Sequence, residues 1–401
     1  MGSATVRDHD GDRVGSTPAS ICGIGAVTGY GWGQKHLWDG LYSGVPAVQP
    51  VEGYEEYLSQ GPVYIATIED GGDPDDGPST YARATRFAAR EAVHNAIDRG
   101  WRPGETVGVI HALVLGDLER WSAFHHRRGR DTSKREWLTL MPSAVLTGIN
   151  QEFGFHGPTM AVSAMCASGV TALLTAKLWL DAGLVSDVLV LACDLSASPE
   201  TCAAFTNVGV LICDSPALDA CRPFQQGSRG FVGGEAAVGM VVSGRSDAAI
   251  GDLLGGATTH DGAHIISIAP DLVEVFRAFE LALARSGVRP EEIAYLNAHG
   301  PGTQQCDDAE AKVVDDLLTG IEGIFSVKPL VGHCQAAAGA VELLSSLFGF
   351  QSGVIPAPPR VAPGHPKLLD GATACVDGPV LKSSLGMGGY NAVAVLAPPS
   401  A

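Results

Sequence analysis

One cysteine stands where a nucleophile would be useful. Cys166 occurs in the segment SAMCASG, residues 163–169, between an expected strand and an expected helix. A thiol at the start of a helix feels the positive end of the helix dipole and exposed N–H groups, and both favour the reactive thiolate. The setting predicts a nucleophile elbow, although the literal pattern GxSxG is absent. A small buried cysteine that only fills space is the alternative.

Two histidines each follow an apolar strand and stand among glycines. His299 lies in NAHGPGT, residues 297–303, and His333 lies in LVGHCQ, residues 330–335. Each is therefore predicted at the floor of a cleft, where an imidazole N–H can hold a thioester oxygen or stabilise a developing enolate. A purely structural role is the alternative for each. The other histidines lack such a setting.

The elements that must position these side chains alternate between strands and helices. Apolar runs predict buried strands at residues 107–115, 159–165, 187–192, 294–298, 325–328 and 392–396. Helical spacing of apolar residues predicts helices over residues 82–98, 167–182 and 335–350. Residues 118–136 are charged and mixed, which indicates a surface excursion. Alternating strands and helices imply α/β layers around a central sheet.

The composition excludes several classes of protein. The 401 residues hold 26 Lys and Arg against 44 Asp and Glu, a net charge of −18, whereas nucleic-acid binding needs a basic footprint. Residues 1–17 form a polar tail without the apolar core of a signal peptide. The longest stretch free of charge and histidine, residues 157–176, contains Thr, Ser, Gly and Pro, so it predicts a buried strand and helix better than a membrane span. We expect a cytoplasmic protein that binds neither nucleic acid nor membranes.

The cysteines do not form a pattern of their own. The chain has nine, an odd number, with no CxxC motif and no Cys/His spacing typical of a metal site. A disulfide framework and a bound metal are therefore not expected.

Taken together, Cys166, His299 and His333 resemble the Cys-His-His triad of the β-ketoacyl synthases, in particular ketosynthases of the second type. These are the decarboxylating condensing enzymes of fatty-acid and polyketide synthesis. The resemblance covers nearly the whole chain after the tail. Further matching motifs follow in the family's order: residues 23–28 with Trp38 and residues 41–44, residues 222–224 with 230–235, Asp307 and Glu310 after His299, Lys328 five residues before His333, and the glycine loop 386–392.

The resemblance implies a thiolase-like fold, a duplicated five-layer α-β-α-β-α sandwich. It implies an N-terminal half over residues 18–250, which carries the nucleophile elbow, and a C-terminal half over residues 251–401, which carries both histidines. It also implies a homodimer with the first half in the interface. A heterodimer with a ketosynthase-like partner stays open.

The resemblance further implies a ketosynthase mechanism. Cys166 would accept an acyl group from an acyl carrier protein, and His299 and His333 would hold a malonyl-type extender while it loses CO₂. The backbone N–H groups of Cys166 and Met387 would form the oxyanion hole. No bound cofactor or metal is implied, and the phosphopantetheine arm of the carrier enters as substrate.

Other residues take roles by the same resemblance. Lys328 would orient and polarise His333 through Glu310. Asp307, Glu310 and Phe231 would support the site. Substrate contacts are implied for Met165, Thr303, Met387 and Tyr390.

The sequence departs from the family pattern at the substrate entrance. Pro301 stands where the His-Gly-Thr-x-Thr loop usually has its first threonine, and residues 329–330 read Pro-Leu in place of a polar pair. Met387 replaces the usual phenylalanine gate, and Tyr390 replaces a threonine. These changes favour a stand-alone ketosynthase of a specialised polyketide or natural-product pathway.

Docking of an acidic carrier protein needs a local positive patch on this acidic chain. The densest basic segment, residues 127–135, makes Arg127, Arg128 and Arg130 the predicted contacts. A solvated loop is the alternative.

Four other functions are alternatives. A ketosynthase-like fold with the same thiol and histidines also serves an acyltransferase, or a cyclase that closes a carrier-bound chain by aldol or lactone formation. A non-catalytic chain-length partner is disfavoured because Cys166 is present. A thiolase that uses coenzyme A is disfavoured because His333 and the glycine loop match ketosynthases better.

Overall fold

The computed structural model describes residues 17–58, 61–126, 134–244 and 246–400. Of the predicted tail, only Thr17 lies among them. Within the described residues, no helix combines the length and the apolar character needed to cross a bilayer.

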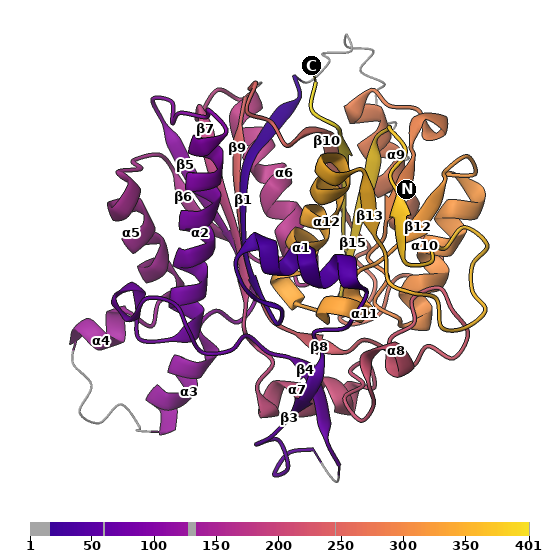
Figure 1. Ribbon diagram of the computed structural model, residues 1–401, viewed down its shortest axis with the longest axis horizontal. Helices are drawn as coiled ribbons and strands as arrows, with labels where there is room; N and C mark the ends of the chain where they lie inside the picture. Colours follow the sequence, from indigo (N-terminus) through magenta and orange to yellow (C-terminus); the bar gives the residue numbers. More distant parts are fainter. Residues whose placement is uncertain (1–16, 59–60, 127–133, 245, 401) are drawn as a thin grey trace, which may run out of the picture.

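One large sheet of eleven described strands runs through the protein (Figure 1). Its path is β12 (Gly323–Phe325), β11 (Tyr295–Asn297), β15 (Val380–Gly386), β16 (Tyr390–Ala397), β10 (Gly251–His260), β1 (Ala19–Thr28), β9 (Ala236–Ser243), β7 (Asp187–Asp194), β5 (Val107–Ala112) and β6 (Thr159–Val162), with β2 (Gly31–Trp32) paired to β1. The antiparallel pair β1–β10 joins the two halves.

The two halves repeat one strand pattern outward from this seam. In the first half, β1, β9 and β7 are antiparallel neighbours, and β7, β5 and β6 are parallel. In the second half, β10, β16 and β15 are antiparallel, and β15, β11 and β12 are parallel. The repeat confirms the predicted duplicated, thiolase-like α/β fold. The predicted boundary at residue 250 falls between β9 and β10 and stays a prediction.

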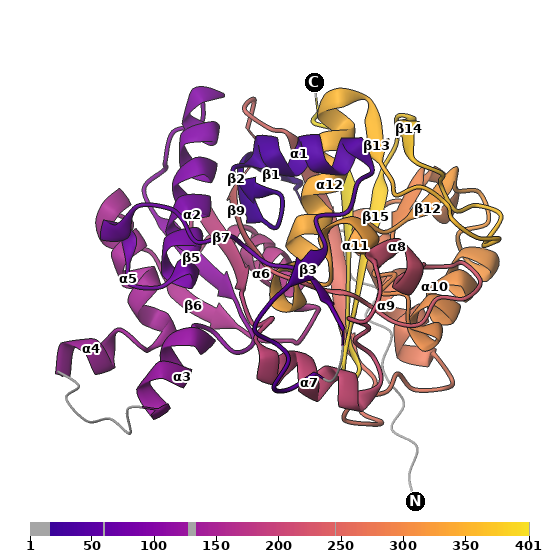
Figure 2. The same cartoon turned by 60° about the horizontal axis from the view of Figure 1, so that its bottom comes forward.

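Helices form three layers around the two half-sheets (Figures 1 and 2). On the outer face of the first half, α2 (Thr80–Asp98) packs on β1, β7 and β9, with α5 (Pro142–Phe153) beside it. On the outer face of the second half lie α9 (Val273–Ser286) and α10 (Gln304–Asp316). Between the halves, α6 (Ser168–Asp181) and α12 (Ala338–Ser352) contact each other and strands of both halves.

The central helices are apolar because both of their faces are covered. In α12 every residue from Ala338 to Gly349 is buried, so no polar stripe is needed. Where α6 meets α12, a side chain on Gly169 would place its Cβ 2.9 Å from the backbone nitrogen of Ala340. Glycine at this position therefore allows the two helices to approach closely.

Shorter elements complete the fold. They are α1 (Gln34–Ser43), α3 (Leu118–His126), α4 (Lys134–Leu138), α7 (Pro199–Val208), α8 (Ala217–Ala220), α11 (Lys328–Val331), the 3₁₀ turns η1 (Pro74–Asp76), η2 (Pro290–Glu292) and η3 (Gln335–Ala337), the sheet of β3 (Gln49–Val51), β4 (Val63–Ala66) and β8 (Gly233–Gly234), and the pair β13 (Val354–Pro356) and β14 (Ala372–Ala374).

One predicted element is wrong near the site. The strand expected over residues 325–328 ends at Phe325, and Lys328 begins helix α11. Pro329 favours the helix, because its fixed φ suits the first helical turn, where no N–H is needed. The helix expected over residues 335–350 begins with η3 and continues as α12.

Candidate active site

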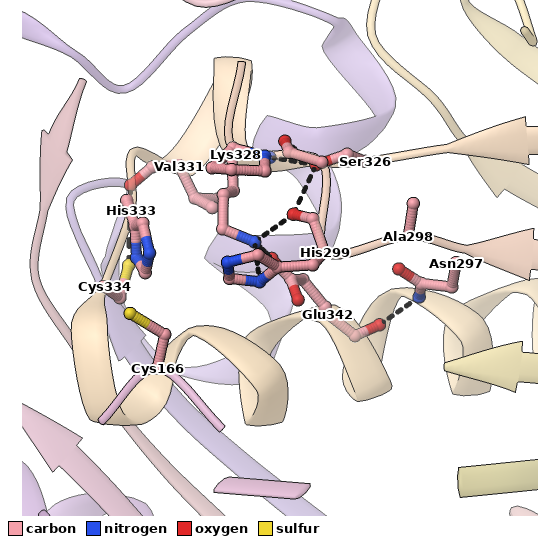
Figure 3. Close-up of polar contacts among 12 residues, drawn as sticks. Cys166, Asn297, Ala298, His299, Ser326, Lys328, Val331, His333, Cys334 and Glu342 are labelled. Atoms are coloured by element: carbon pink, nitrogen blue, oxygen red, sulfur yellow. Dashed lines mark hydrogen bonds and ion pairs between the residues drawn. The ribbon is translucent and has the colours of Figure 1, made fainter. Parts of the chain in front are cut away.

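Cys166, His299 and His333 lie together in one buried cluster (Figure 3). The sulfur and one nitrogen of each ring all lie within 4.8 Å of one another, and the two imidazole centroids are 5.4 Å apart. Cys166 lies in the turn directly before α6, in the first half. His299 follows β11 and His333 follows α11, both in the second half. The cluster therefore spans the two halves of the fold.

The cysteine is held by a tight turn before α6. Met165 adopts a left-handed backbone conformation with φ of 50°, which is uncommon for a residue with a side chain. The Ser168 hydroxyl accepts the Ala164 N–H at 2.8 Å and donates to the Met165 carbonyl at 2.6 Å, which fixes the turn. The Cys166 thiol points to Gln335 Oε1, 3.8 Å away.

Burial opposes the expected preference for the thiolate. Burial raises the pKa of the Cys166 thiol to about 11. The backbone N–H groups of Met387 and of Cys166, together with the charge of Lys328, lower this pKa, but they do not offset the loss of water. The same N–H groups face the sulfur, where an oxyanion on a bound acyl group would form.

His333 has a defined tautomer. Its ring nitrogen Nδ1 accepts the Gln335 backbone N–H at 3.1 Å, so in the neutral ring the proton is on Nε2. The turn before it depends on Gly332, whose φ is 75° and whose Cβ position lies 2.4 Å from the Gly233 carbonyl oxygen. Phe231 packs edge-to-face on the ring, with centroids 4.8 Å apart.

The Nδ1 atom of His299 contacts a lysine, whereas the Nδ1 atom of His333 accepts a backbone N–H. Lys328 Nζ lies 3.2 Å from His299 Nδ1, donates to the His299 carbonyl, and forms an ion pair with Glu342 (Figure 3). An ammonium group only donates, so Nδ1 accepts and the proton of the neutral ring is on Nε2. The prediction that Lys328 acts on His333 through Glu310 is therefore wrong, because α11 directs the lysine to His299.

Both imidazoles are held neutral. Burial lowers the pKa of His299 and of His333 well below the ordinary value, and the positive charge of Lys328 lowers both further. Two neutral rings with Nε2–H groups beside a thiol can donate two hydrogen bonds to one carbonyl oxygen.

Two carboxylates hold the loop that follows His299. Glu310 accepts the backbone N–H groups of His299 at 2.7 Å and of Gly300 at 2.8 Å. Asp307 accepts those of Gly302 at 3.1 Å and of Phe224 at 3.0 Å. Burial raises the pKa of Asp307 to about 8. The hydrogen bonds of Glu310 and Asp307 thus position the backbone of this loop.

Comparison with known proteins identifies the family. The chain matches the family model "Beta-ketoacyl synthase, N-terminal domain" over residues 16–248 and "Beta-ketoacyl synthase, C-terminal domain" over residues 250–361. The chain belongs to the beta-ketoacyl synthase family. It is a condensing enzyme and an acyltransferase.

Relatives of this beta-ketoacyl synthase come from fatty-acid and polyketide synthesis. It is 27% identical to 3-oxoacyl-[acyl-carrier-protein] synthase 2 of Staphylococcus aureus over 407 residues, which cover 94% of this chain and 99% of the relative. It is 28% identical to the putative polyketide beta-ketoacyl synthase 1 of Streptomyces cyaneus over 373 residues, 84% of this chain and 86% of the relative.

Solved structures share the fold. A chain of a type II polyketide synthase complex, in which an acyl carrier protein is bound to its ketosynthase with a hexaketide, matches with a TM-score of 0.83 and 22% identity over 95% of this chain and 99% of that chain. The ishigamide ketosynthase/chain length factor matches with a TM-score of 0.83 and 23% identity over 96% of this chain and 100% of that chain.

The predicted substrate contacts of this beta-ketoacyl synthase take separate places. Met387 lies in the turn between β15 and β16, beside Cys166. Thr303 precedes α10 and is half-buried. Tyr390 begins β16, and its half-exposed ring packs edge-to-face on His260 at 4.7 Å. The predicted docking residues lie outside the described part of the chain: Arg127, Arg128 and Arg130.

Sequence reasoning missed Glu342, Gln335 and Lys382. Glu342 is a single charge within the apolar helix α12, and Lys382 is a single charge within the apolar strand β15. A lone charge in an otherwise apolar element was the available signal, because such a group is rarely fully buried without a partner. Gln335 carried no comparable signal.

A cavity of about 1000 Å³ lies near the cluster. It shares Ala197 and Thr201 with a much smaller cavity that is lined by Phe231, His333 and Gln335. Aromatic side chains of the larger cavity are Tyr54, Tyr57, Tyr81 and Trp121. The two cavities thus meet at the start of α7.

A thiol and two imidazoles at this separation also suit a d-block metal ion. The expected absence of a metal therefore stays a prediction.

Proposed function

We propose that this beta-ketoacyl synthase joins an acyl group carried on Cys166 to a carrier-bound malonyl-type extender by decarboxylative Claisen condensation. The observation that carries the proposal is the pair of neutral imidazoles that each place a ring nitrogen within 4.8 Å of the thiol sulfur, while their Nδ1 atoms accept from Lys328 and from the Gln335 N–H. No cofactor takes part, and the phosphopantetheine arm of an acyl carrier protein delivers both substrates.

In the loading step the Cys166 sulfur attacks the thioester carbonyl of the acyl carrier. The tetrahedral oxyanion accepts the backbone N–H groups of Cys166 and Met387, which already face the sulfur. The carrier thiolate leaves and takes the proton that Cys166 gives up. The acyl group is now a thioester of Cys166.

In the second step His299 and His333 donate from Nε2 to the thioester oxygen of the extender. The bond to the extender carboxylate breaks, CO₂ leaves, and the electron pair passes to the enolate that the two N–H groups stabilise. Phe231, which packs on His333, makes the wall of this chamber apolar. An apolar wall favours loss of the charged carboxylate as neutral CO₂.

In the third step the enolate carbon attacks the acyl carbonyl on Cys166. A new carbon–carbon bond forms, and the oxyanion again accepts the N–H groups of Cys166 and Met387. Collapse of this intermediate expels the Cys166 thiolate and leaves a β-ketoacyl chain on the carrier. Lys328 and Glu310 position His299 during these steps.

The substrate belongs to a specialised pathway rather than to ordinary fatty-acid elongation. Support comes from Pro301, Met387 and Tyr390, which change the entrance, and from the large cavity that adjoins the site. A long or oxygen-bearing acyl chain fits a cavity whose walls carry several tyrosines.

The proposed assembly is a homodimer, and a heterodimer with a ketosynthase-like partner is the alternative. Strand β6 lies at the edge of the large sheet, and Thr159, Met160 and Ala161 on it are exposed. An apolar edge strand with free N–H and C=O groups favours pairing with the same strand of a second copy.

The test combines the protein with an acyl carrier and a malonyl carrier and follows the products by mass spectrometry. The proposal predicts an acyl adduct on Cys166, then a β-ketoacyl carrier and one CO₂ per product. Acyl transfer or a cyclised product without release of CO₂ would contradict it and favour the acyltransferase or cyclase alternative.

A further inference from the structure

A second lysine lies in the same buried polar cluster as Lys328. Lys382 is on β15 and has no exposed side-chain surface. Its Nζ lies 2.6 Å from Glu342 Oε2, while the other oxygen of the same carboxylate contacts Lys328. One carboxylate on α12 therefore links two ammonium groups that come from different elements.

Lys382 also holds the backbone that leads into His299. Its Nζ donates to the carbonyls of Asn297 at 3.2 Å and of Ala298 at 3.1 Å, and also to the Ser383 carbonyl. Lys328 holds the next carbonyl, that of His299. Three successive carbonyls are thus fixed by two lysines.

The backbone N–H groups at His299 are held with the help of Ser383, the residue after Lys382. Ser383 donates to Glu310 Oε1, and its hydroxyl lies 3.2 Å from the His299 backbone nitrogen. Glu310 in turn accepts the N–H groups of His299 and Gly300. Strand β15 therefore helps to hold both the carbonyl groups and the N–H groups of the backbone around His299, and this backbone sets the direction of the His299 ring.

The charges around His299 come from every packed element. Lys328 comes from α11, Lys382 from β15, Glu342 from α12, Glu310 from α10 and His333 from the loop after α11. Lys328 and Lys382 both disfavour the imidazolium form of His299. A positive charge that is fully buried acts at longer range than one in water.

We propose that Lys382 is a positioning residue for His299, because it clamps the backbone that leads into the ring and adds a buried charged group beside that segment. The expected effect on the rate of CO₂ release rests on the proposed function. The position and the protonation of His299 can be measured without turnover. Lys382 does not touch the reacting atoms, so its loss affects the step that uses His299 more than the step that uses Cys166.

The test compares K382M and K382Q with K177M. Methionine keeps the length of the side chain without charge or donors, and glutamine keeps a donor without charge. Lys177 is a buried lysine on α6 that bonds Asp181 and the Thr17 carbonyl, so K177M also removes a buried ion-pair partner. Each variant is assayed for acyl loading of Cys166 and for CO₂ release from a malonyl carrier, over a range of pH. Histidine NMR measures the pKa of His299 directly.

We expect K382M to load Cys166 within about twofold of wild type but to release CO₂ up to about 100-fold more slowly, since small displacements of a catalytic group have effects of that size. The rate of CO₂ release should decrease less in K382Q, because the glutamine side chain can still donate hydrogen bonds. In both variants the pKa of His299 rises, since a positive charge is lost, and the acidic limb of CO₂ release moves to higher pH. K177M should leave the rates and the pKa of His299 unchanged.

Unchanged CO₂ release and an unchanged His299 pKa in folded K382M or K382Q overturn the proposal. Equal decreases in the rates of Cys166 loading and of CO₂ release also overturn the proposal, and so does failure of both K382M and K382Q to fold. Either result would make Lys382 a purely structural residue. If wild type itself releases no CO₂, the proposed function fails. The His299 pKa in K382Q then still decides the role of Lys382.

Discussion

At the scale of residues, the site depends on groups whose protonation is set by burial. The Cys166 thiol is protonated at neutral pH, whereas both histidines are neutral and present Nε2–H groups. A thiol with a raised pKa is a poor nucleophile. The backbone N–H groups of Cys166 and Met387 lower this pKa, but burial outweighs them.

The reactivity of Cys166 should follow its raised pKa. Because its pKa is about 11, the thiolate fraction and the rate of alkylation by iodoacetamide should increase about tenfold per pH unit from pH 7 to 10. Peptide mass spectrometry of Cys166 measures this rate. A rate that stops increasing near pH 8 would contradict the account, because it would mean that the helix dipole dominates over burial in setting the pKa of Cys166.

The sequence predicts the reactive residues better than their supports. Cys166, His299 and His333 stand beside small residues at the ends of strands or helices, and this local pattern can be recognised in the sequence. The partner of Lys328 could not be predicted, because α11 turns the lysine toward His299, which follows β11 and lies 29 positions earlier in the chain. Glu342 and Lys382 meet only when α12 and β15 pack together.

At the scale of elements, close helix packing brings the two halves of the site together. Helix α6 begins two residues after Cys166 and contacts α12, which carries Glu342. The strand order of the duplicated fold was predictable only through the family resemblance, since the apolar runs give strands but not their neighbours. The short α11 was missed because its apolar residues resemble a strand.

Gly169→Ala should destabilise the protein by about 1–3 kcal/mol, because its Cβ would lie 2.9 Å from the Ala340 backbone nitrogen in a packed core. Gly148→Ala on α5 is the matched control. There the nearest atoms belong to the Arg86 side chain at 3.9 Å, and alanine should stabilise the helix slightly. Urea unfolding midpoints measure both, and equal midpoints for the two variants would contradict the packing.

Ala197 lines both the small and the large cavity, so Ala197→Phe should reduce the space where the two cavities lie side by side. Long acyl carriers should then load Cys166 at least tenfold more slowly, while acetyl carriers are unaffected, because only the long chain needs the larger space. Ala204→Phe, on the exposed side of α7, is the control. Equal loading of long chains by both variants would exclude this route for the chain.

At the scale of the whole molecule, neither half is a complete enzyme. The first half supplies the thiol and one oxyanion donor, and the second half supplies both histidines and Met387. The seam between β1 and β10 keeps the two halves in register. The sequence predicts the α/β class from alternation alone, but not that the two halves share one site.

Met160→Lys should shift a dimer toward monomer, because a charge on an apolar edge strand opposes strand pairing between copies. Leu184→Lys, at an exposed position after α6, should leave the mass unchanged. Light scattering after size exclusion measures both. A wild-type monomer, or an unaffected M160K dimer, would contradict pairing through β6.

The most direct measurement of the central claim is the release of labelled CO₂ by wild type, C166A, H299A and H333A, with an acyl carrier and a carboxyl-labelled malonyl carrier. Wild type should release one CO₂ for each β-ketoacyl product, and C166A should form neither acyl-enzyme nor product. H299A and H333A should still load the acyl group but release CO₂ far more slowly. Product formation by C166A, or wild-type release of CO₂ by either histidine variant, would contradict the account.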